Sequence, residues 1–220
     1  MGTFYLDPEG IQKRSFEIIS HELENRNASK AYGRMTDAQK SVVIRCIHTT
    51  ADFDYAENLK FSDGAIAKFH ELVESGAYIV TDTNMALAGI NRANAERYGC
   101  KLRCFMADED VAAAAKKRGR TRASVSVEKA AGLDGPVIFV IGNAPTALIT
   151  LKEHYDIGYR PAFVIGVPVG FVNVVEAKEL IMGCDIPYIV NAGQKGGSNV
   201  AAAIVNALLL LMPQKDMRGV

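Results

Sequence analysis

The residue best suited to chemistry in this chain is His48, which lies in the run Arg45-Cys-Ile-His-Thr-Thr-Ala-Asp52. Imidazole is the side chain whose ordinary pKa lies nearest neutrality, so His48 is the leading candidate for transferring a proton. Thr36, followed three residues later by Gln39, forms a capping-box pattern that predicts the start of a helix. His48 should then lie near the C-terminal end of that helix. The alternative is a solvated polar face on which the histidine has no function.

The predicted helix has two faces of different character, because successive residues are about 100° apart around its axis. One stripe is polar: Ser41, Arg45, His48 and Asp52. The other face is apolar: Val42, Val43, Cys46 and Ile47. We therefore expect the helix to pack through its apolar face and to present Arg45 and His48. An arginine in this position could bind a substrate carboxylate through two parallel hydrogen bonds.

Three glycine-containing loops could bind a ligand that carries several carboxylates or phosphates. Each follows an apolar strand pattern and precedes a helical one: Gly142-Asn-Ala-Pro145, Gly166-Val-Pro-Val-Gly170 and Asn191-Ala-Gly-Gln-Lys-Gly-Gly-Ser198. In an open parallel sheet such loops meet at the carboxyl edge, where ligands bind. Glycine lets the backbone approach a ligand closely, N–H groups at helix starts favour anions, and Lys195 adds a positive charge. The alternative for each loop is a tight turn without a ligand.

A nucleotide is a less favoured ligand for these loops. No GxGxxG motif follows a first strand, and Gly193-Gln-Lys-Gly-Gly-Ser198 has its lysine in the wrong place for a phosphate-binding loop. A nucleotide-dependent α/β enzyme is therefore the least favoured of the functions that we consider.

The elements that must position these residues alternate along the chain. Five short runs rich in Val, Ile, Phe or Tyr predict strands: Ala77–Thr81, Lys101–Phe105, Val137–Ile141, Ala162–Ile165 and Pro187–Val190. Helices are predicted from a Ser62 cap to Gly76, from a Thr121 cap to Gly132, from Pro145 to Tyr155, over Val174–Met182 and over Ser198–Met212. Strands that alternate with helices pair in parallel through right-handed crossovers. The prediction is one α/β domain over residues 1–220, three-layer α/β/α, with a mainly parallel, about five-stranded sheet.

Composition limits the classes of function. The 220 residues contain 25 Lys plus Arg and 25 Asp plus Glu, so no global basic field would attract nucleic acid or an anionic membrane. A hydrophobic fraction of 49% argues against disorder. The first residues lack the charged and apolar runs of a signal peptide, and no apolar run reaches membrane-spanning length. We expect a cytoplasmic protein with neither nucleic-acid nor membrane partners.

Cysteine and histidine positions give little sign of a metal centre. Cys46, Cys100, Cys104 and Cys184 lack paired CxxC spacing, and no histidine neighbours the Cys100–Cys104 pair, so we expect reduced structural thiols and no bound metal. The other histidines are predicted to be surface residues: His21, His70 and His154.

Five strings of the chain, in this order, resemble the precorrin-8X methylmutases of cobalamin biosynthesis. They are Ile47-His-Thr-Thr-Ala-Asp-Phe53, Thr81-Asp-Thr-Asn-Met-Ala-Leu87, Gly142-Asn-Ala-Pro-Thr-Ala-Leu148, Gly166-Val-Pro-Val-Gly-Phe-Val172 and Lys195-Gly-Gly-Ser-Asn-Val-Ala201. The similarity runs from about Ser15 to Leu208, and it is greatest to the cobalt-precorrin-8 branch. Two short stretches depart from the family pattern: Ala123 precedes Ser124, and Asn173-Val-Val-Glu-Ala replaces Gly-Ala-Ala-Glu-Ser.

The resemblance implies an isomerase that moves a methyl group from carbon eleven to carbon twelve of ring C in a corrinoid, giving cobyrinate or hydrogenobyrinate. It implies no cofactor. The family's catalytic histidine matches His48, which would act as proton donor or acceptor at the ring-C nitrogen or an equivalent site. The family's substrate-contacting serine and arginine match Ser15 and Arg45, and another family arginine matches Arg122. The resemblance also implies a homodimer with sites near its interface and a tightly held product.

Because the net charge of the chain is zero, individual cations near the site must bind the substrate carboxylates. We assign this role to Arg45, Arg122 and Lys195. The alternative is that they pair with Asp52 or other surface acids. Ser15, on a helical pattern between Ile11 and Ile18, could instead hydrogen-bond its own helix backbone. A second functional hypothesis is a corrinoid or tetrapyrrole carrier without catalysis, which replacement of His48 would distinguish from an isomerase.

Overall fold

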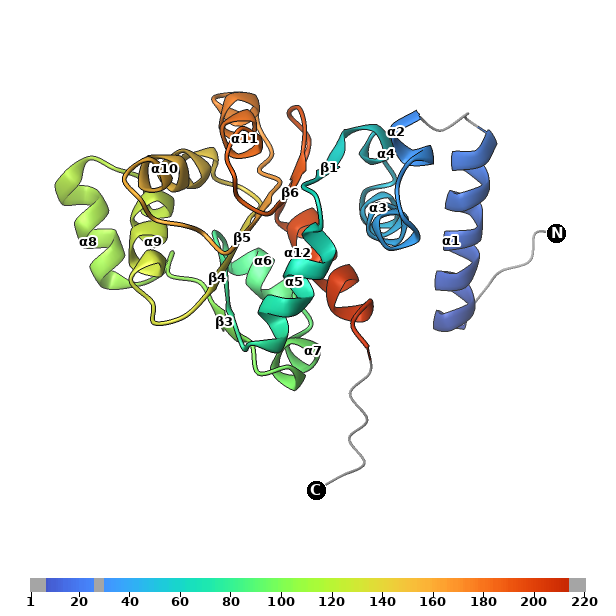
Figure 1. The fold of residues 1–220 in the computed structure, drawn as a ribbon, viewed down its shortest axis with the longest axis horizontal. Coiled ribbons are helices and arrows are strands. Elements are labelled where there is room, and N and C mark those ends of the chain that lie inside the picture. Colours follow the sequence, from blue (N-terminus) through green and yellow to red (C-terminus); the bar gives the residue numbers. More distant parts are fainter. Residues whose placement is uncertain (1–6, 26–29, 214–220) are drawn as a thin grey trace, which may run out of the picture.

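A six-stranded sheet runs through the molecule in the order β1-β6-β5-β4-β2-β3 (Figure 1). The structure is a computed structural model that describes residues 7–25 and 30–213. The strands are β1 Leu59–Phe61, β2 Tyr78–Thr81, β3 Lys101–Arg103, β4 Val137–Ile141, β5 Phe163–Gly166 and β6 Tyr188–Asn191. The pairs β2–β3, β2–β4, β4–β5 and β5–β6 are parallel, and only β1 runs antiparallel to its neighbour β6. The mainly parallel α/β prediction is confirmed.

Helices cover both faces of the sheet and enclose two apolar cores. The helices are α1 Pro8–Asn25, α2 Lys30–Gly33, α3 Asp37–Thr50, α4 Tyr55–Asn58, α5 Ala65–Glu74, α6 Asn84–Gly89, α7 Arg92–Arg97, α8 Glu109–Arg118, α9 Arg122–Ala131, α10 Pro145–Asp156, α11 Val174–Met182 and α12 Ser198–Leu210. One core lies between the sheet and the helices α3, α5 and α12. The other lies between the opposite face of the sheet and the helices α8, α9, α10 and α11. This is the predicted three-layer arrangement.

Several helix starts follow the capping chemistry read from the sequence. Thr36 accepts a hydrogen bond from the Gln39 backbone N–H at 3.3 Å, and the Gln39 side chain accepts one from the Thr36 N–H at 2.9 Å. The Thr121 side chain caps α9 by accepting a hydrogen bond from the Ser124 backbone N–H, and Pro145 is the first residue of α10. These local signals were sufficient because each depends on residues three or four positions apart.

The structure corrects the sequence prediction around β1. This strand was not predicted, because three residues are too few to establish an alternating pattern. Ser62 does not cap α5, since its hydroxyl accepts a hydrogen bond from the Tyr188 N–H at 2.9 Å and so extends the contact with β6. The helix instead begins after Gly64, whose φ of 66° lies in the left-handed region, and it ends at Glu74. The sheet therefore has one strand more than the five that were predicted.

The cysteines are free thiols, and two of them lie in the first apolar core. Burial raises the pKa of Cys46 to about 12 and that of Cys100 to about 11, which keeps both thiols protonated and unreactive. Among the histidines, His21 is exposed as predicted, whereas His70 and His154 are half-buried. His70 lies 3.0 Å from the Leu208 carbonyl.

The described residues offer neither a metal-binding cluster nor a membrane-spanning helix. No group of His, Cys, Asp or Glu side chains within residues 7–25 and 30–213 could hold a metal ion. In that same part of the chain, no helix is long and apolar enough to cross a membrane.

Candidate active site

The helix α3 packs as its sequence predicted and leaves His48 on its outer face. The four apolar side chains of the inner face are all buried: Val42, Val43, Cys46 and Ile47. The helix α1 lies beside α3 on the side away from the sheet (Figure 1). His48 is an exposed residue near the C-terminal end of α3. The polar side chains of α3 that could act on a ligand, Arg45 and His48, thus face α1 and the neighbouring helix α12.

Ser15 of α1 contacts His48 directly. The Ser15 hydroxyl oxygen lies 2.8 Å from Nδ1 of His48, a hydrogen bond between residues 33 positions apart. Ser15 therefore binds the histidine rather than its own helix backbone. Because Nδ1 is engaged, Nε2 is the ring nitrogen left to exchange a proton with a ligand.

The ring of Phe16 contacts both His48 and Arg45. Its ring packs against the His48 ring at 85°, with 5.3 Å between centroids, and the guanidinium carbon of Arg45 lies 5.2 Å from the Phe16 centroid. Arg45 is half-buried, and burial lowers its pKa. Within the described residues, no carboxylate pairs with Arg45. Its guanidinium can therefore meet a ligand carboxylate.

A cleft of about 310 Å³ opens beside His48 and Arg45. Its other walls are Thr49 of α3, Gly89 of α6 and four residues of α12: Asn199, Ala202, Ala203 and Asn206. A Cβ on Gly89 would lie only 2.8 Å from the Ala202 Cβ, so glycine is what allows α6 to approach α12 here. The sequence predicted α12 but gave no sign that it lines the site.

The two amides on α12 differ in what they bind. Asn206 is committed to the protein, because it donates to the Gly89 carbonyl at 2.8 Å and accepts from the Asn91 N–H at 2.7 Å. Asn199 is exposed and makes no side-chain hydrogen bond to any residue that the structure describes. The cleft therefore offers an imidazole, a guanidinium and one amide to a ligand.

Lys195, predicted to bind substrate, forms ion pairs within the chain. Its Nζ lies 2.6 Å from a carboxylate oxygen of Asp52 and 2.6 Å from one of Asp54. The hydrogen bonds that its ammonium donates to both acids raise the pKa of Lys195. The loop after β6 is thereby tied to the segment that follows His48, as the alternative interpretation of these cations proposed.

The three glycine loops do meet at the carboxyl edge, as predicted. A Cβ on Gly142 would lie 2.7 Å from the Ser198 Cα, and the Gly197 N–H donates to the Val167 carbonyl at 2.9 Å. A Cβ on Gly196 would lie 2.0 Å from the same Val167 oxygen, so no other residue fits there. The glycines allow the loops to pack against one another.

Asp82, which follows β2, occupies the anion-binding groups of the first loop. Its carboxylate accepts hydrogen bonds from three backbone N–H groups, those of Gly142 at 2.9 Å, Asn143 at 2.8 Å and Ala144 at 2.7 Å. Burial raises the pKa of Asp82, and these hydrogen bonds oppose that rise. The sequence analysis missed this residue, although it lies within the string Thr81-Asp-Thr. Its hydrogen-bond partners are 60 to 62 residues away in the sequence.

Lys178 of α11 binds the backbone of the third glycine loop, which follows β6. Its side chain is fully buried and donates to the Gly193 carbonyl at 2.6 Å and the Lys195 carbonyl at 2.9 Å. Burial lowers its pKa to about 8. Asn191 adds a hydrogen bond from its amide to the Lys195 carbonyl at 2.9 Å. The loop's shape is therefore set by buried partners that the sequence analysis did not single out.

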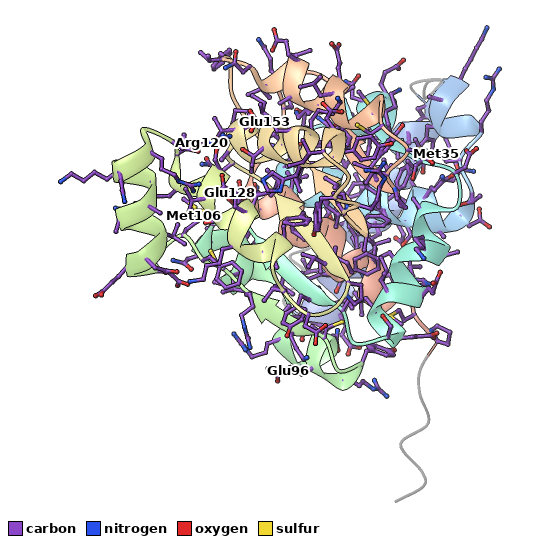
Figure 2. All side chains as sticks on the ribbon, turned by 60° about the vertical axis from the view of Figure 1, so that its left-hand side comes forward. Met35, Glu96, Met106, Arg120, Glu128 and Glu153 are labelled. Carbon is purple, nitrogen blue, oxygen red and sulfur yellow. The ribbon has the colours of Figure 1, made fainter. Side chains whose placement is uncertain are left out.

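Arg122 is not brought to His48 within one chain. It is the exposed first residue of α9, and Figure 1 places α9 and α3 on opposite sides of the sheet. Figure 2 shows the charged residues of that side, where Arg120 pairs with Glu153 at 2.5 Å and Glu128 pairs with Arg118. Arg122 itself forms no ion pair with a described residue.

Comparison with known proteins gives one consistent result. A family model described as precorrin-8X methylmutase matches residues 10–211. The cobalt-precorrin-8 methylmutase of Leptospira interrogans is 42% identical over 219 residues, covering 94% of this chain and 96% of that protein. The one from Salmonella typhimurium is 42% identical over 92% of this chain and 94% of its own length. The precorrin-8X methylmutase of Pseudomonas aeruginosa is 37% identical over 94% and 98%.

A solved structure agrees with these sequences. The precorrin-8x methyl mutase from Thermus thermophilus superposes with a TM-score of 0.81 at 37% identity, covering 92% of this chain and 95% of that one.

Proposed function

Because the chain belongs to the precorrin-8X methylmutase family, we propose that the cleft beside His48 is where the family's methyl shift takes place, with His48 as the proton-transferring group. The chain is an intramolecular methyl transferase of cobalamin biosynthesis. It moves a methyl group from carbon eleven to carbon twelve of ring C in a corrinoid.

The observation that carries the His48 proposal is its hydrogen bond to Ser15. In the charged imidazolium, Nδ1–H donates to the Ser15 oxygen, and Nε2–H can donate its proton to the ring-C nitrogen or an equivalent site. Protonation draws electron density from ring C and favours migration of the methyl group with its bonding electrons. Substrate and product are isomers, so the proton leaves the macrocycle again as the product forms. Ser15 keeps the imidazole in the orientation that this exchange requires.

Arg45 is the cation best placed to bind a corrinoid carboxylate. It lies one helical turn before His48, lines the same cleft and has no acid partner among the described residues. Lys195 would have to exchange Asp52 or Asp54 for the substrate, so we assign it a weaker contribution. Asn199 completes the polar set that faces the ligand.

The position of Arg122 supports a homodimer. Because α9, which begins at Arg122, and α3, which carries His48, lie on opposite sides of the sheet (Figure 1), we infer that Arg122 acts on a corrinoid bound beside the His48 of a second protomer. The loop after β5 adds an apolar surface suited to self-association, with Phe171 86% exposed and Val172 74% exposed. Sedimentation equilibrium tests the dimer. Mixing His48→Ala with Arg122→Ala protomers should restore turnover if the two residues act across an interface.

We assign the cobalt-loaded substrate to this chain, since both relatives at 42% identity are named cobalt-precorrin-8 methylmutases. Turnover of matched cobalt-containing and metal-free substrates tests this assignment.

We also propose that the product is tightly held and that the enzyme acts in the cytoplasm, where its free thiols would stay reduced. A corrinoid band in the visible spectrum of the purified protein, and cell fractionation, test these two points.

The decisive experiment replaces His48 and measures turnover and binding separately. We expect His48→Ala to lower the single-turnover rate by about 10²–10⁴-fold, the usual contribution of a general acid. Product affinity and the fold should stay close to the parent's, because His48 is exposed. His21→Ala, which removes an exposed histidine of α1, is the matched control and should turn over normally. Parent-like conversion by His48→Ala would show that another group transfers the proton.

A further inference from the structure

Phe16 touches both polar groups of the α3 stripe at once. Its ring meets the His48 ring at 85° and lies 5.2 Å from the guanidinium carbon of Arg45. It also borders a second hollow of about 560 Å³ between α1 and α3, whose walls include Tyr32 and Ser41. The ring therefore stands between this hollow and the cleft that His48 lines.

Arg45 has little else to fix it. Its long side chain has several rotatable bonds, and within the described residues it has no ion pair and donates no side-chain hydrogen bond. An aromatic face attracts a guanidinium group through its electron-rich ring. When His48 carries its proton, it and Arg45 are like charges one helical turn apart and repel each other. A ring that contacts both can hold them at one separation.

The geometry points to Phe16 as a positioning residue for the methyl shift. Its ring fixes the guanidinium of Arg45 relative to the imidazole of His48, so that one carboxylate and ring C of the same corrinoid are engaged together. This inference rests on the proposed function and deepens it, because it identifies what sets the spacing of the two groups. Phe16 itself touches no reacting atom.

The test compares ring-removing and ring-keeping variants with the corrinoid substrate. Phe16→Leu should lower kcat/KM by about 10-fold, with kcat falling and KM rising, because contacts of this type commonly change rates by that order. It should also shift the pH dependence of kcat/KM, since the distance between Arg45 and His48 is no longer fixed. Phe16→Tyr keeps the ring and borders an open hollow, so it should stay within about twofold of the parent.

Controls separate positioning from packing. Ile19→Val removes one methylene from the buried face of α1 and leaves Phe16 in place, so its kcat, KM and pH profile should match the parent's. Phe16→Met provides a second ring-free variant should Phe16→Leu fold poorly, which thermal melting and product titration will show.

Two results would overturn the inference. One is a ring-free variant with parent kcat, KM and pH profile. The other is an equal loss in Ile19→Val, which would assign the effect to the packing of α1. His48→Ala measured in parallel keeps the two proposals apart. An inactive His48→Ala with a parent-like Phe16→Leu rejects only the role of Phe16, whereas an active His48→Ala rejects the proposed function.

Discussion

The cleft beside His48 and the glycine loops at the carboxyl edge both gather polar groups, but they use them in opposite ways. In the loops, the Asp82 carboxylate accepts hydrogen bonds from three backbone N–H groups, and the Lys178 ammonium donates hydrogen bonds to two carbonyls. Lys195 forms ion pairs with two acids. In the cleft, Arg45 has no carboxylate partner in the described chain, and His48 keeps one ring nitrogen unengaged. The loops therefore form the frame, and the cleft keeps the groups that a substrate can use.

The largest effect should come from breaking the frame at Asp82. Asp82→Ala leaves three N–H groups without an acceptor in a buried place, and we expect a loss of about 3–5 kcal/mol in the free energy of unfolding. Denaturant unfolding measures it. Asp134→Ala, an exposed acid in a turn, is the control and should change stability by less than about 0.5 kcal/mol. A loss as small as the control's would mean that the loop does not depend on this carboxylate.

The buried ammonium of Lys178 should give the frame a pH signature. Its pKa in the fold is about 8, below the ordinary value of 10.5, so between those values the unfolded chain binds more protons than the folded one. The free energy of unfolding should then rise with pH in that window, by at most about 1.4 kcal/mol per pH unit. Lys178→Met should lack this rise. Identical pH slopes for parent and variant would show that Lys178 titrates normally.

On the cleft side, Arg45→Ala should weaken product corrinoid binding without unfolding the protein. A charge-assisted contact is worth about 1.5–3 kcal/mol, which corresponds to about 10–150-fold in affinity. Added salt should weaken parent binding more than it weakens binding by the variant. Arg92→Ala, which removes an exposed arginine paired with Glu96, is the control. Titration at two ionic strengths decides, and a parent-like affinity would remove Arg45 from the account.

The smallest effect should follow from Lys195→Ala. Its partners are side chains of its own chain and it is half exposed, so we expect an affinity loss below about tenfold and a slight loss of thermal stability. Measuring it in the same titrations as Arg45→Ala sharpens the contrast between the two regions. A larger loss than for Arg45→Ala would place Lys195 in the binding site and reverse the assignment.

Local pattern was enough to predict much of the fold but only part of the site. The Thr36 cap, the two faces of α3 and the buried run of β4 depend on neighbours within one or two turns, and the structure agrees with them. His48 was singled out by its residue type and helical position, and Ser15 by the family resemblance, but nothing in their spacing showed that they touch. The pairing depends on how α1 docks against α3.

Other residues escaped prediction for related physical reasons. β1 has three residues and gains its order from β6, so no alternation marks it. Lys178 resembles any helical lysine until the loop after β6 folds over it. Asn173 stands where the resemblance implies a glycine, and its φ of 59° lies in the left-handed region that asparagine tolerates. Both β1 and Lys178 depend on contacts that are distant in sequence.

The measurement that tests the central claim most directly is a double-mutant cycle on Ser15 and His48, read as the single-turnover rate of the methyl shift. If Ser15 acts by holding His48, then Ser15→Ala alone should slow the shift by about 10–150-fold, the worth of one hydrogen bond to a charged group. In the His48→Ala background, the same change should cost nothing further. If Ser15→Ala slows the His48→Ala enzyme by the same factor as the parent, the two residues act independently and the account is wrong.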